Sequence, residues 1–417
     1  MARNPAGGAK RLLVLGAGAG QLGLLEAART RGHYVIAADR DPAAPGFRFA
    51  DRRAIISVED EPQLDRLATA ERVDGIVAPG IDWPVAIAAR IAERLALPHP
   101  IDPATAVLAI SKLRQRERFA EAGVPHPQSV VCATTEEAGA AAEGFGYPCV
   151  VKAPDRQGQK GLVLVRDERQ LDAAFVLALA ESRSSVVLVE ELVPGREVTV
   201  NAFSVDGRFS PLTVTDRVVA EPPAFGVALA HVWPSSVTAD ELEAAVGAAR
   251  AAVEAIGVRA GPTYTQVVVG ERGAHVVEVA ARVGGGHDAE LCETALGVDL
   301  NGLALAAALG EPLEEERLKP ADGARGACVR FLVPEPGVLE EVTGVREAEE
   351  LEGVVWVRIY PEPGTTLGPL RRGSDRVGAV LAAGASRAEA VDRAGRAAES
   401  VRFVVANAPA EAVVQAQ

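Results

Sequence analysis

Lysine, aromatic residues and cysteine are all scarce in this sequence of 417 residues. Aromatic side chains make up 4% of it, too few to suggest the base-stacking surfaces of nucleic-acid-binding proteins. The four cysteines show neither a CxxC pair nor metal-ligand spacing, so we expect reduced, mostly buried thiols. Of the 43 basic residues only five are lysine: Lys10, Lys112, Lys152, Lys160 and Lys319.

Positive charge and long apolar runs are also lacking. The 43 basic residues face 57 acidic ones, and the net charge of −14 offers no attraction for nucleic acid or anionic lipid. No apolar run approaches the roughly 18 residues that a membrane-spanning helix needs, and residues 1–9 lack the apolar segment of a secretory signal. These absences predict a cytoplasmic protein of several domains that acts on small molecules, with no nucleic-acid or membrane partner.

The rarity of lysine gives meaning to the lysines that remain. Arginine can replace lysine where only surface charge is needed, whereas a compact ammonium group suits a single phosphate oxygen. Lys152 lies in a run that predicts a buried strand, and Lys160 follows in a glycine-containing loop. We interpret Lys112, Lys152 and Lys160 as phosphate contacts, while chance survival accounts for Lys10 and Lys319.

The first hundred residues alternate strand-like and helix-like patterns. The predicted strands are 11–18, 33–39 and 75–79, with helices at 21–31 and near 63–72. Such alternation implies a parallel sheet, which we place in a Rossmann-like domain at 10–98. A glycine turn follows the first strand and offers Gly18, Gly20 and Gln21 for substrate contact.

The same turn supports an alternative. Together with Asp39 at the end of the second strand, it resembles a dinucleotide-binding fingerprint and would suit an NAD-dependent oxidoreductase. That function leaves Lys152, the glycine loop after it and Glu278 unexplained. We therefore rank it last among the alternatives.

The rest of the chain is predicted to form α+β units. One helix is expected from Asp102 past Lys112 to Glu121. Further predicted elements are strands at 149–154, 185–193, 197–205, 263–269, 274–281, 329–334, 353–361 and 377–384, with helices at 168–181, 239–256 and 387–400. Residues 270–273 join two of these strands as a hairpin.

A phosphate-binding loop is suggested by residues 155–161, DRQGQKG, which follow Lys152 directly. Backbone amides of a glycine loop can wrap phosphate oxygens while ammonium groups neutralise them. No Walker-type GKS or GKT sequence is present, so the chain is not a P-loop ATPase. Downstream, residues 189–197 could present backbone groups to adenine and Glu197 to ribose, although taken alone they also fit a strand edge with solvated glutamates.

A metal site is suggested by the hairpin. Gln266 and Glu278 lie on its two strands, and oxygen ligands from neighbouring strands suit Mg²⁺. Glu278 is flanked by valines, which makes a solvated position less plausible. Arg282 follows four residues later, where a guanidinium group can stabilise charge on a transferring phosphoryl group.

Five segments in order resemble the ATP-grasp carboxylate–amine ligases: Ser111-Lys112, VVKAP at 150–154, DRQGQKG at 155–161, VEELVPGRE at 189–197 and EVAARVGGGH at 278–287. The resemblance covers nearly the whole chain. It implies an α/β and α+β multidomain protein in which the parallel-sheet domain precedes an ATP-grasp domain at 99–324. A lid subdomain would lie at about 128–204, and a small α+β domain would follow at 325–405.

The resemblance also implies how ATP is bound. Lys112 and Lys152 would contact its phosphates, and a loop that includes Gly158, Lys160 and Gly161 would fold over them. The adenine would be bordered by Glu190, Glu191, Leu192 and Val193, and Glu197 would hold the ribose.

Mg²⁺, or Mn²⁺ in its place, would be held by Gln266 and Glu278, with Arg282 stabilising the transition state that forms an acyl phosphate. The chain departs from the family pattern at two positions. Many members have glutamate where this chain has Gln266, and asparagine where it has Ala280. We therefore predict one tightly held metal ion and a second that is held weakly.

Within the family the chain is most similar to the L-amino-acid ligases, through its GGGHDAEL run at 284–291 and its C-terminal segment. This implies two steps, in which ATP activates a carboxylate and an amine then displaces phosphate. Small-molecule acids and amines would be the partners, a homodimer is expected, and the tentative substrate contacts are His231, Gly285, Gly286, His287 and Asp288.

Two further alternatives stay open. The N-terminal sequence GAGAGQLGLLEAA also resembles the purine-biosynthetic ATP-grasp carboxylases and formyltransferases. A nucleotide-binding protein without turnover is the other, and Ala280 is the residue that favours it.

Overall fold

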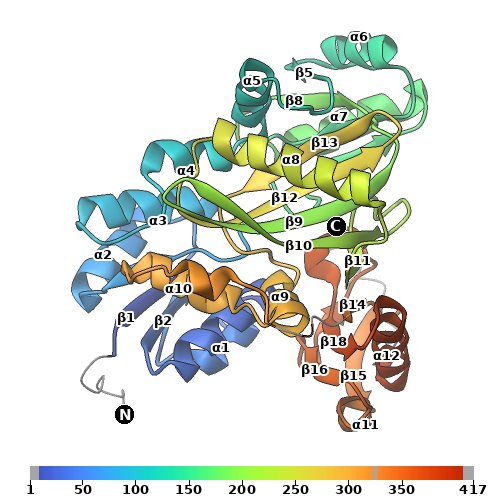
Figure 1. Ribbon diagram of the computed structural model, residues 1–417. Coiled ribbons are helices and arrows are strands. Elements are labelled where there is room, and N and C mark those ends of the chain that lie inside the picture. The colour runs from blue at the N-terminus through green and yellow to red at the C-terminus, as the bar shows by residue number, and fades with distance from the viewer. Residues whose placement is uncertain (1–8, 322, 324–325, 407–417) are drawn as a thin grey trace.

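The structure is a computed structural model that describes residues 9–321, 323 and 326–406 (Figure 1). A parallel sheet of order β3-β2-β1-β4 opens the chain, as the sequence predicted. Its strands are β1 (Arg11–Leu15), β2 (Tyr34–Asp39), β3 (Arg52–Ile55) and β4 (Gly75–Val77), and its helices α1 (Leu22–Thr30), α2 (Glu61–Glu71) and α3 (Trp83–Arg94). The sequence analysis missed β3, because three of its four residues are exposed and two are arginine.

The prediction of one helix from Asp102 to Glu121 is wrong. The structure has two helices, α4 (Pro103–Ala109) and α5 (Lys112–Ala122). Ser111 lies between them in an extended conformation and caps α5 by accepting a hydrogen bond from the Arg114 amide. Lys112 therefore begins a helix, and its own amide donates to the Pro154 carbonyl beside the predicted phosphate loop at 3.0 Å.

A four-stranded sheet of order β5-β8-β6-β7 forms a separate layer at the top of Figure 1. Its elements are β5 (Ser129–Cys132), α6 (Thr135–Phe145), β6 (Cys149–Lys152), β7 (Leu162–Val165), α7 (Leu171–Glu181) and β8 (Val187–Glu191). Alanine, leucine and phenylalanine side chains of the two helices pack against valines of the sheet in a core of their own. The loop between β6 and β7 is the predicted phosphate loop.

An eight-stranded sheet of order β13-β12-β9-β10-β11-β14-β18-β16 runs through the rest of the molecule. It consists of β9 (Arg196–Val205), β10 (Arg208–Val219), β11 (Ala228–Trp233), β12 (Gly261–Gly270), β13 (Gly273–Ala280), β14 (Gly326–Leu332), β16 (Val354–Ile359) and β18 (Gly378–Gly384). A three-stranded sheet adds β15 (Gly337–Thr343), β17 (Thr366–Leu367) and β19 (Arg402–Ala406). The C-terminal strands thus continue the sheet of the central region, while the domain limits themselves stay a prediction.

Five further helices cover these sheets: α8 (Ala239–Ala255), α9 (Asp288–Leu296), α10 (Leu300–Leu309), α11 (Val345–Glu349) and α12 (Arg387–Ser400). No single helix in the described residues is long and apolar enough to cross a membrane. Helices α9 and α10 reach that length and composition only when taken together, across a bend of 118°. The four cysteines are free and buried, as expected.

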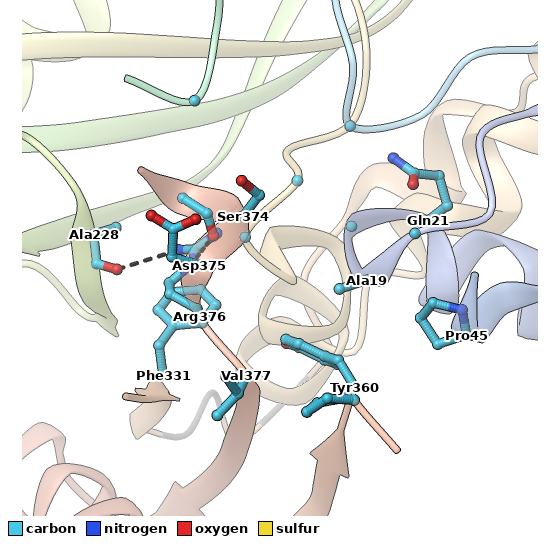
Figure 2. Close-up of a pocket in the computed structure, with 18 of the residues that line it drawn as sticks. Ala19, Gln21, Pro45, Ala228, Phe331, Tyr360, Ser374, Asp375, Arg376 and Val377 are labelled. Carbon is cyan, nitrogen blue, oxygen red and sulfur yellow. Dashed lines mark hydrogen bonds between the residues drawn. The ribbon is translucent and has the colours of Figure 1, made fainter. Parts of the chain in front are cut away.

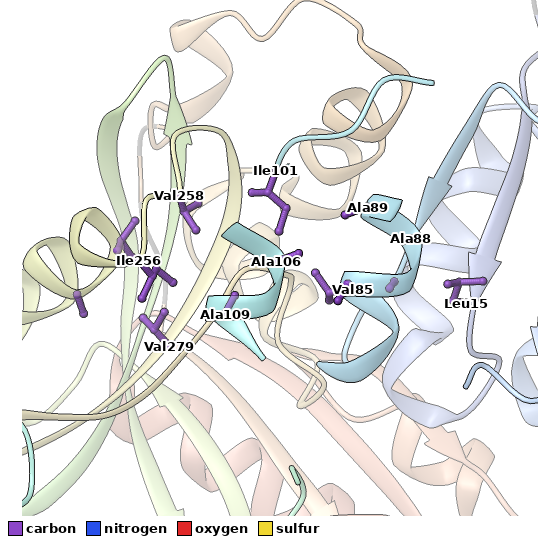
Figure 3. Close-up of a cluster of buried hydrophobic side chains, with 14 of the residues drawn as sticks. Leu15, Val85, Ala88, Ala89, Ile101, Ala106, Ala109, Ile256, Val258 and Val279 are labelled. Atoms are coloured by element: carbon purple, nitrogen blue, oxygen red, sulfur yellow. The ribbon is translucent and has the colours of Figure 1, made fainter. Parts of the chain in front are cut away.

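One buried cluster joins the N-terminal sheet to the central sheet (Figure 3). It includes Leu15 of β1, Val85 of α3, Ala106 of α4, Ile256 after α8 and Val279 of β13. Helices α3 and α4 lie between the two sheets and contribute apolar side chains to a shared core. This shared core keeps the N-terminal glycine turn in a fixed place relative to β12 and β13.

Candidate active site

A cavity of about 940 Å³ lies where the N-terminal turn, the central sheet, the predicted phosphate loop and the C-terminal strands meet (Figure 2). Ten of the residues singled out in the sequence line it: Gly18, Gly20, Gln21, Gly158, His231, Gln266, Glu278, Arg282, Gly285 and Gly286. The others lie outside its lining: Lys112, Lys152, Lys160, Gly161, Glu190, Glu191, Leu192, Val193, Glu197, His287 and Asp288. The structure thus brings together residues that are more than 250 positions apart in the sequence.

The two predicted metal ligands face each other across the hairpin. Gln266 and Glu278 are direct cross-strand partners, and both line the cavity. Glu278 Oε1 accepts a hydrogen bond of 2.8 Å from Lys112 Nζ. Burial acts to raise the pKa of Glu278, but the charges of Lys112, Arg282 and Lys152 together outweigh it and hold that pKa below its usual value. Glu278 is therefore an anion that a cation can bind.

These donors fit one Mg²⁺ ion better than two. Mg²⁺ prefers oxygen ligands and usually takes one or two carboxylates from the protein, with phosphates and water completing the octahedron. Ala280 is buried and has no oxygen in its side chain. The described residues contain no group of three or more histidine, cysteine or acidic side chains that could hold a metal. The site therefore depends on a ligand that brings oxygen atoms of its own, as ATP does.

Lys152 and Glu190 form a buried ion pair next to the predicted phosphate loop. Their charged atoms lie 2.5 Å apart, and Arg116 Nε lies 2.9 Å from the same carboxylate. Burial lowers the pKa of Lys152 to about 8, although Glu190 opposes the change. The carboxylate of Glu190 is thus an internal counter-ion.

The strand end predicted to border adenine also makes internal contacts. The Glu191 carboxylate accepts hydrogen bonds from Arg272 at 2.7 and 2.9 Å. The carboxylate of Glu197, predicted to hold ribose, accepts a hydrogen bond from Arg217 at 2.6 Å. The nucleoside contacts stay a prediction, and Glu197 would have to share its carboxylate with Arg217.

Positive backbone φ angles shape the predicted phosphate loop. Gly158, Gln159 and Gly161 have φ of 68°, 65° and 65°, a region that glycine adopts without strain. The carbonyl of Gly158 accepts a hydrogen bond of 3.2 Å from the amide of Gly373, near the C-terminal end of the chain. Burial, with a smaller contribution from the charge of Arg372, lowers the pKa of Lys160.

Arg282 has a carboxylate partner that the sequence analysis missed. Its Nε and Nη2 lie 2.8 and 2.7 Å from Asp82 Oδ1, and its guanidinium carbon lies 5.2 Å from the centre of the Tyr264 ring. Asp82 directly precedes α3 and is separated from Arg282 by 200 residues. Asp82 lies in the sequence Ile81-Asp82-Trp83, which carries no motif that could have revealed this pair.

Glycine at two positions allows the backbone of the N-terminal domain to approach the three consecutive glycines at 284–286. A Cβ atom on Gly20 would lie 3.1 Å from the carbonyl oxygen of Gly285, and one on Gly285 would lie 3.0 Å from that of Gly80. Backbone therefore packs directly against backbone on this side of the cavity. Gly286 has a similar role, since a Cβ there would lie 2.6 Å from His231 Nε2.

The two candidate histidines differ in their surroundings. His231 lines the cavity, and burial lowers its pKa to about 4 despite Asp288, whose Oδ1 is 3.8 Å from His231 Nδ1. It is therefore neutral at pH 7. His287 lies behind the cavity wall, where its Nε2 is 2.7 Å from the hydroxyl of Tyr360 and its Nδ1 is 3.1 Å from Glu290. Tyr360, which the sequence analysis did not single out, is the member of this group that lines the cavity.

Asp39 makes local contacts in place of the ribose contact of an oxidoreductase. Its Oδ2 accepts from the amide of Ala17 at 2.8 Å, and its Oδ1 accepts from the amide of Asp41 at 3.0 Å. Oδ2 therefore holds the glycine turn in place, and Oδ1 holds the loop that follows β2. Gln21 is buried against this turn and donates to the carbonyl of Pro79 at 2.8 Å. These contacts count against the dinucleotide alternative.

Two protein-family models match the chain. The carbamoyl-phosphate synthase L chain ATP-binding domain matches residues 111–316, and the L-amino acid ligase C-terminal domain 2 matches residues 330–406. A formate-dependent phosphoribosylglycinamide formyltransferase of Burkholderia pseudomallei is 29% identical over 95% of this chain and 96% of its own.

Solved structures show the same fold. An L-amino acid ligase from Bacillus licheniformis superposes with a TM-score of 0.80 at 22% identity, over 95% of this chain and 99% of that one. A phosphoribosylglycinamide synthetase from Anaerococcus prevotii gives 0.75 at 20% identity, over 95% and 100%. This chain therefore has the ATP-grasp fold, and its central and C-terminal parts are similar to ATP-grasp ligases.

Proposed function

We propose that the protein joins the carboxylate of one amino acid to the amine of another substrate, with ATP as the energy source and ADP and phosphate as products. One observation carries the choice of substrate class. Phe331, Tyr360 and the segments 361–368 and 373–377 line the same cavity as the predicted metal ligands. All of them fall within residues 330–406, the part that matches the L-amino acid ligase model. The part most similar to amino-acid ligases therefore forms the wall against which a substrate would bind.

The reaction takes place in two steps. In the first, an oxygen of the substrate carboxylate attacks the γ-phosphorus of ATP, the bond to the bridging oxygen breaks, and ADP leaves with that electron pair. In the second, the amine attacks the acyl carbon, phosphate leaves, and the amine gives up one proton. The protein accelerates both steps by holding the reactants together and by balancing negative charge.

Each charged group near the cavity has a role in this scheme. Lys112 and Lys152 balance the charge of the phosphates. Arg282, held by Asp82, faces the transferring phosphoryl group. A Mg²⁺ ion on Glu278 and Gln266 would neutralise phosphate oxygens and align them for attack. His231, neutral at pH 7, is suited to accept or donate a hydrogen bond to a substrate.

The experiment is a screen of amino-acid pairs with MgATP, scored by release of phosphate and ADP. We expect release that needs both an acid and an amine, together with a new amide product seen by mass spectrometry. The variants Lys152→Ala and Glu278→Ala serve as controls, since both should abolish release. ATP binding without turnover on any pair would instead favour a nucleotide-binding protein.

A second candidate is a formyltransferase or carboxylase of the purine type. The observation that favours it is the match along nearly the full length of both chains to the Burkholderia formyltransferase. Formate with phosphoribosylglycinamide forms a separate arm of the same screen, and release only in that arm would select this candidate. We also propose a homodimer, which light scattering after gel filtration would test.

A further inference from the structure

Three arginines line the cavity, and two of them have acidic partners. Arg217 pairs with Glu197 and Arg282 with Asp82. Arg376, which lies two residues before β18, pairs with no carboxylate among the described residues. A cation without a carboxylate partner at the wall of a cavity is well placed to bind an anion that enters the cavity.

The side chain of Arg376 is held in one orientation by the protein. Its Nε donates to the carbonyl of Gly373 at 2.8 Å and its Nη1 to that of Ala228 at 3.2 Å. Its guanidinium carbon lies 3.7 Å from the centre of the Phe331 ring, so the planar group stacks on an aromatic face (Figure 2). These contacts leave Nη2 and one hydrogen of Nη1 for a ligand.

Burial lowers the pKa of Arg376 to about 10, while the nearby Tyr360 opposes the change. The group is therefore still protonated at neutral pH, and it lacks the full hydration that would compensate its charge. An arginine with two free, parallel donors binds a carboxylate in bidentate fashion. The orientation is fixed before the ligand arrives, which lowers the entropy that binding costs.

The proposed reaction brings two carboxylates into the cavity, and they meet different fates. One is activated beside Glu278 and Arg282 and loses its charge when it becomes an acyl phosphate. The other belongs to the amine-bearing amino acid and stays charged throughout. A permanent cation on the C-terminal wall, where Arg376 and Phe331 lie opposite Ala19 and Gln21 in Figure 2, suits the second carboxylate.

We propose that Arg376 binds the free carboxylate of the amino acid that supplies the amine, an inference that rests on the proposed function. It makes Arg376 a specificity-determining residue: the second substrate is selected for its carboxylate as well as for its amine. Amines that lack a carboxylate are then poor substrates.

The test compares an amino acid with its carboxamide as the amine donor, in the wild type and in Arg376→Met. The wild type should prefer the acid, with a KM for the carboxamide roughly 30-fold higher or more. Arg376→Met should raise the KM for the acid to that of the carboxamide and leave the KM for ATP unchanged. Arg372→Met, an exposed arginine that pairs with Asp375 in the same segment, is the matched control and should retain the preference.

Each outcome has one meaning. If Arg376→Met turns over and still prefers the acid, the inference is overturned while the proposed function stands. If the wild type releases phosphate with no amino-acid pair, the proposed function fails and the inference with it. If release occurs only with phosphoribosylglycinamide, and Arg376→Met raises the KM for that compound, the anion bound is a phosphate and the carboxylate proposal is wrong. Thermal unfolding and ITC of the amino acid onto the wild type and Arg376→Met, with a non-hydrolysable ATP analogue present, separate loss of binding from loss of folding.

Discussion

The two walls of the cavity differ in how the charges of their cations are balanced. On the wall toward the ATP-binding region, Arg282 pairs with Asp82, and behind that wall Lys112 pairs with Glu278 and Lys152 with Glu190. On the C-terminal wall, Arg376 lies on an aromatic ring and bonds only to carbonyl groups among the described residues. The cations on the first side are neutralised by acidic side chains of the protein before any ligand binds. The charge of Arg376 on the second side would be neutralised by the ligand itself.

This difference determines how substitutions on each side should affect the protein. A buried ion pair loses hydration, and removing one partner leaves the other charge without compensation. On the paired wall, substitutions should therefore disturb more than one residue at once. On the unpaired wall, a substitution should change substrate choice and little else.

The largest expected effect comes from breaking the metal end of the paired wall. Glu278→Ala removes the one carboxylate at the predicted Mg²⁺ site and leaves Lys112 without its counter-ion, so kcat should fall roughly 1000-fold. Measurement is by ADP release at saturating MgATP. Glu271→Ala, an exposed acid at the turn of the same hairpin, is the control and should be near normal. Near-normal turnover in Glu278→Ala would show that the metal site lies elsewhere.

A smaller loss is expected when the partner of Arg282 is neutralised. Asp82→Asn keeps the size of the side chain but removes the charge that orients the guanidinium group, so kcat should fall about 10- to 100-fold. The KM for ATP should change little, because Asp82 would act only through Arg282. Asp65→Asn, which removes the charge of a surface pair with Arg94, should leave kcat unchanged. A change confined to KM would contradict the positioning role.

A pH effect should follow from Lys152. Its pKa of about 8 means that the ammonium loses its proton as the pH rises from 7 to 9, and with it the attraction for phosphate. The value of kcat/KM for ATP, which reports groups of the free enzyme, should therefore fall above pH 8. Lys152→Arg, whose side chain stays protonated, should have a lower value but a flat profile. A wild-type profile that is flat up to pH 10 would count against a phosphate contact by Lys152.

The smallest effect concerns the second metal ion. Because Ala280 offers no oxygen, titration of Mg²⁺ into the protein with a non-hydrolysable ATP analogue should give one tight and one weak site. Isothermal titration calorimetry measures both. Two equally tight sites would mean that a ligand other than residue 280 completes the second site.

Much of the fold could be predicted from the sequence. Strands such as β6, β8 and β18 have unbroken apolar runs, and the hairpin of β12 and β13 has a glycine turn at 270–273. The strand β3 could not be found, because an edge strand with exposed arginines carries no apolar pattern. The break between α4 and α5 was missed because Ser111 can cap a helix or continue one, and packing decides between them.

For the candidate site, motifs singled out the residues predicted to face ATP, but not the partners that come from outside those motifs. Glu278 and Gln266 were found because a hairpin fixes which residues lie opposite each other. Asp82 and Arg376 were missed because their significance depends on contacts between distant segments. His287 was singled out for its place after the glycine run, yet its left-handed backbone, with φ of 61°, begins α9 and it contacts Tyr360 behind the wall.

The hydrogen bond from the Gly373 amide to the Gly158 carbonyl joins two segments that are more than 200 residues apart in the sequence. Arg376 is bonded to the carbonyl of Gly373, so one short segment connects the wall that carries Arg376 to the predicted phosphate loop. A shift in the backbone of this segment would therefore displace the arginine and the loop together.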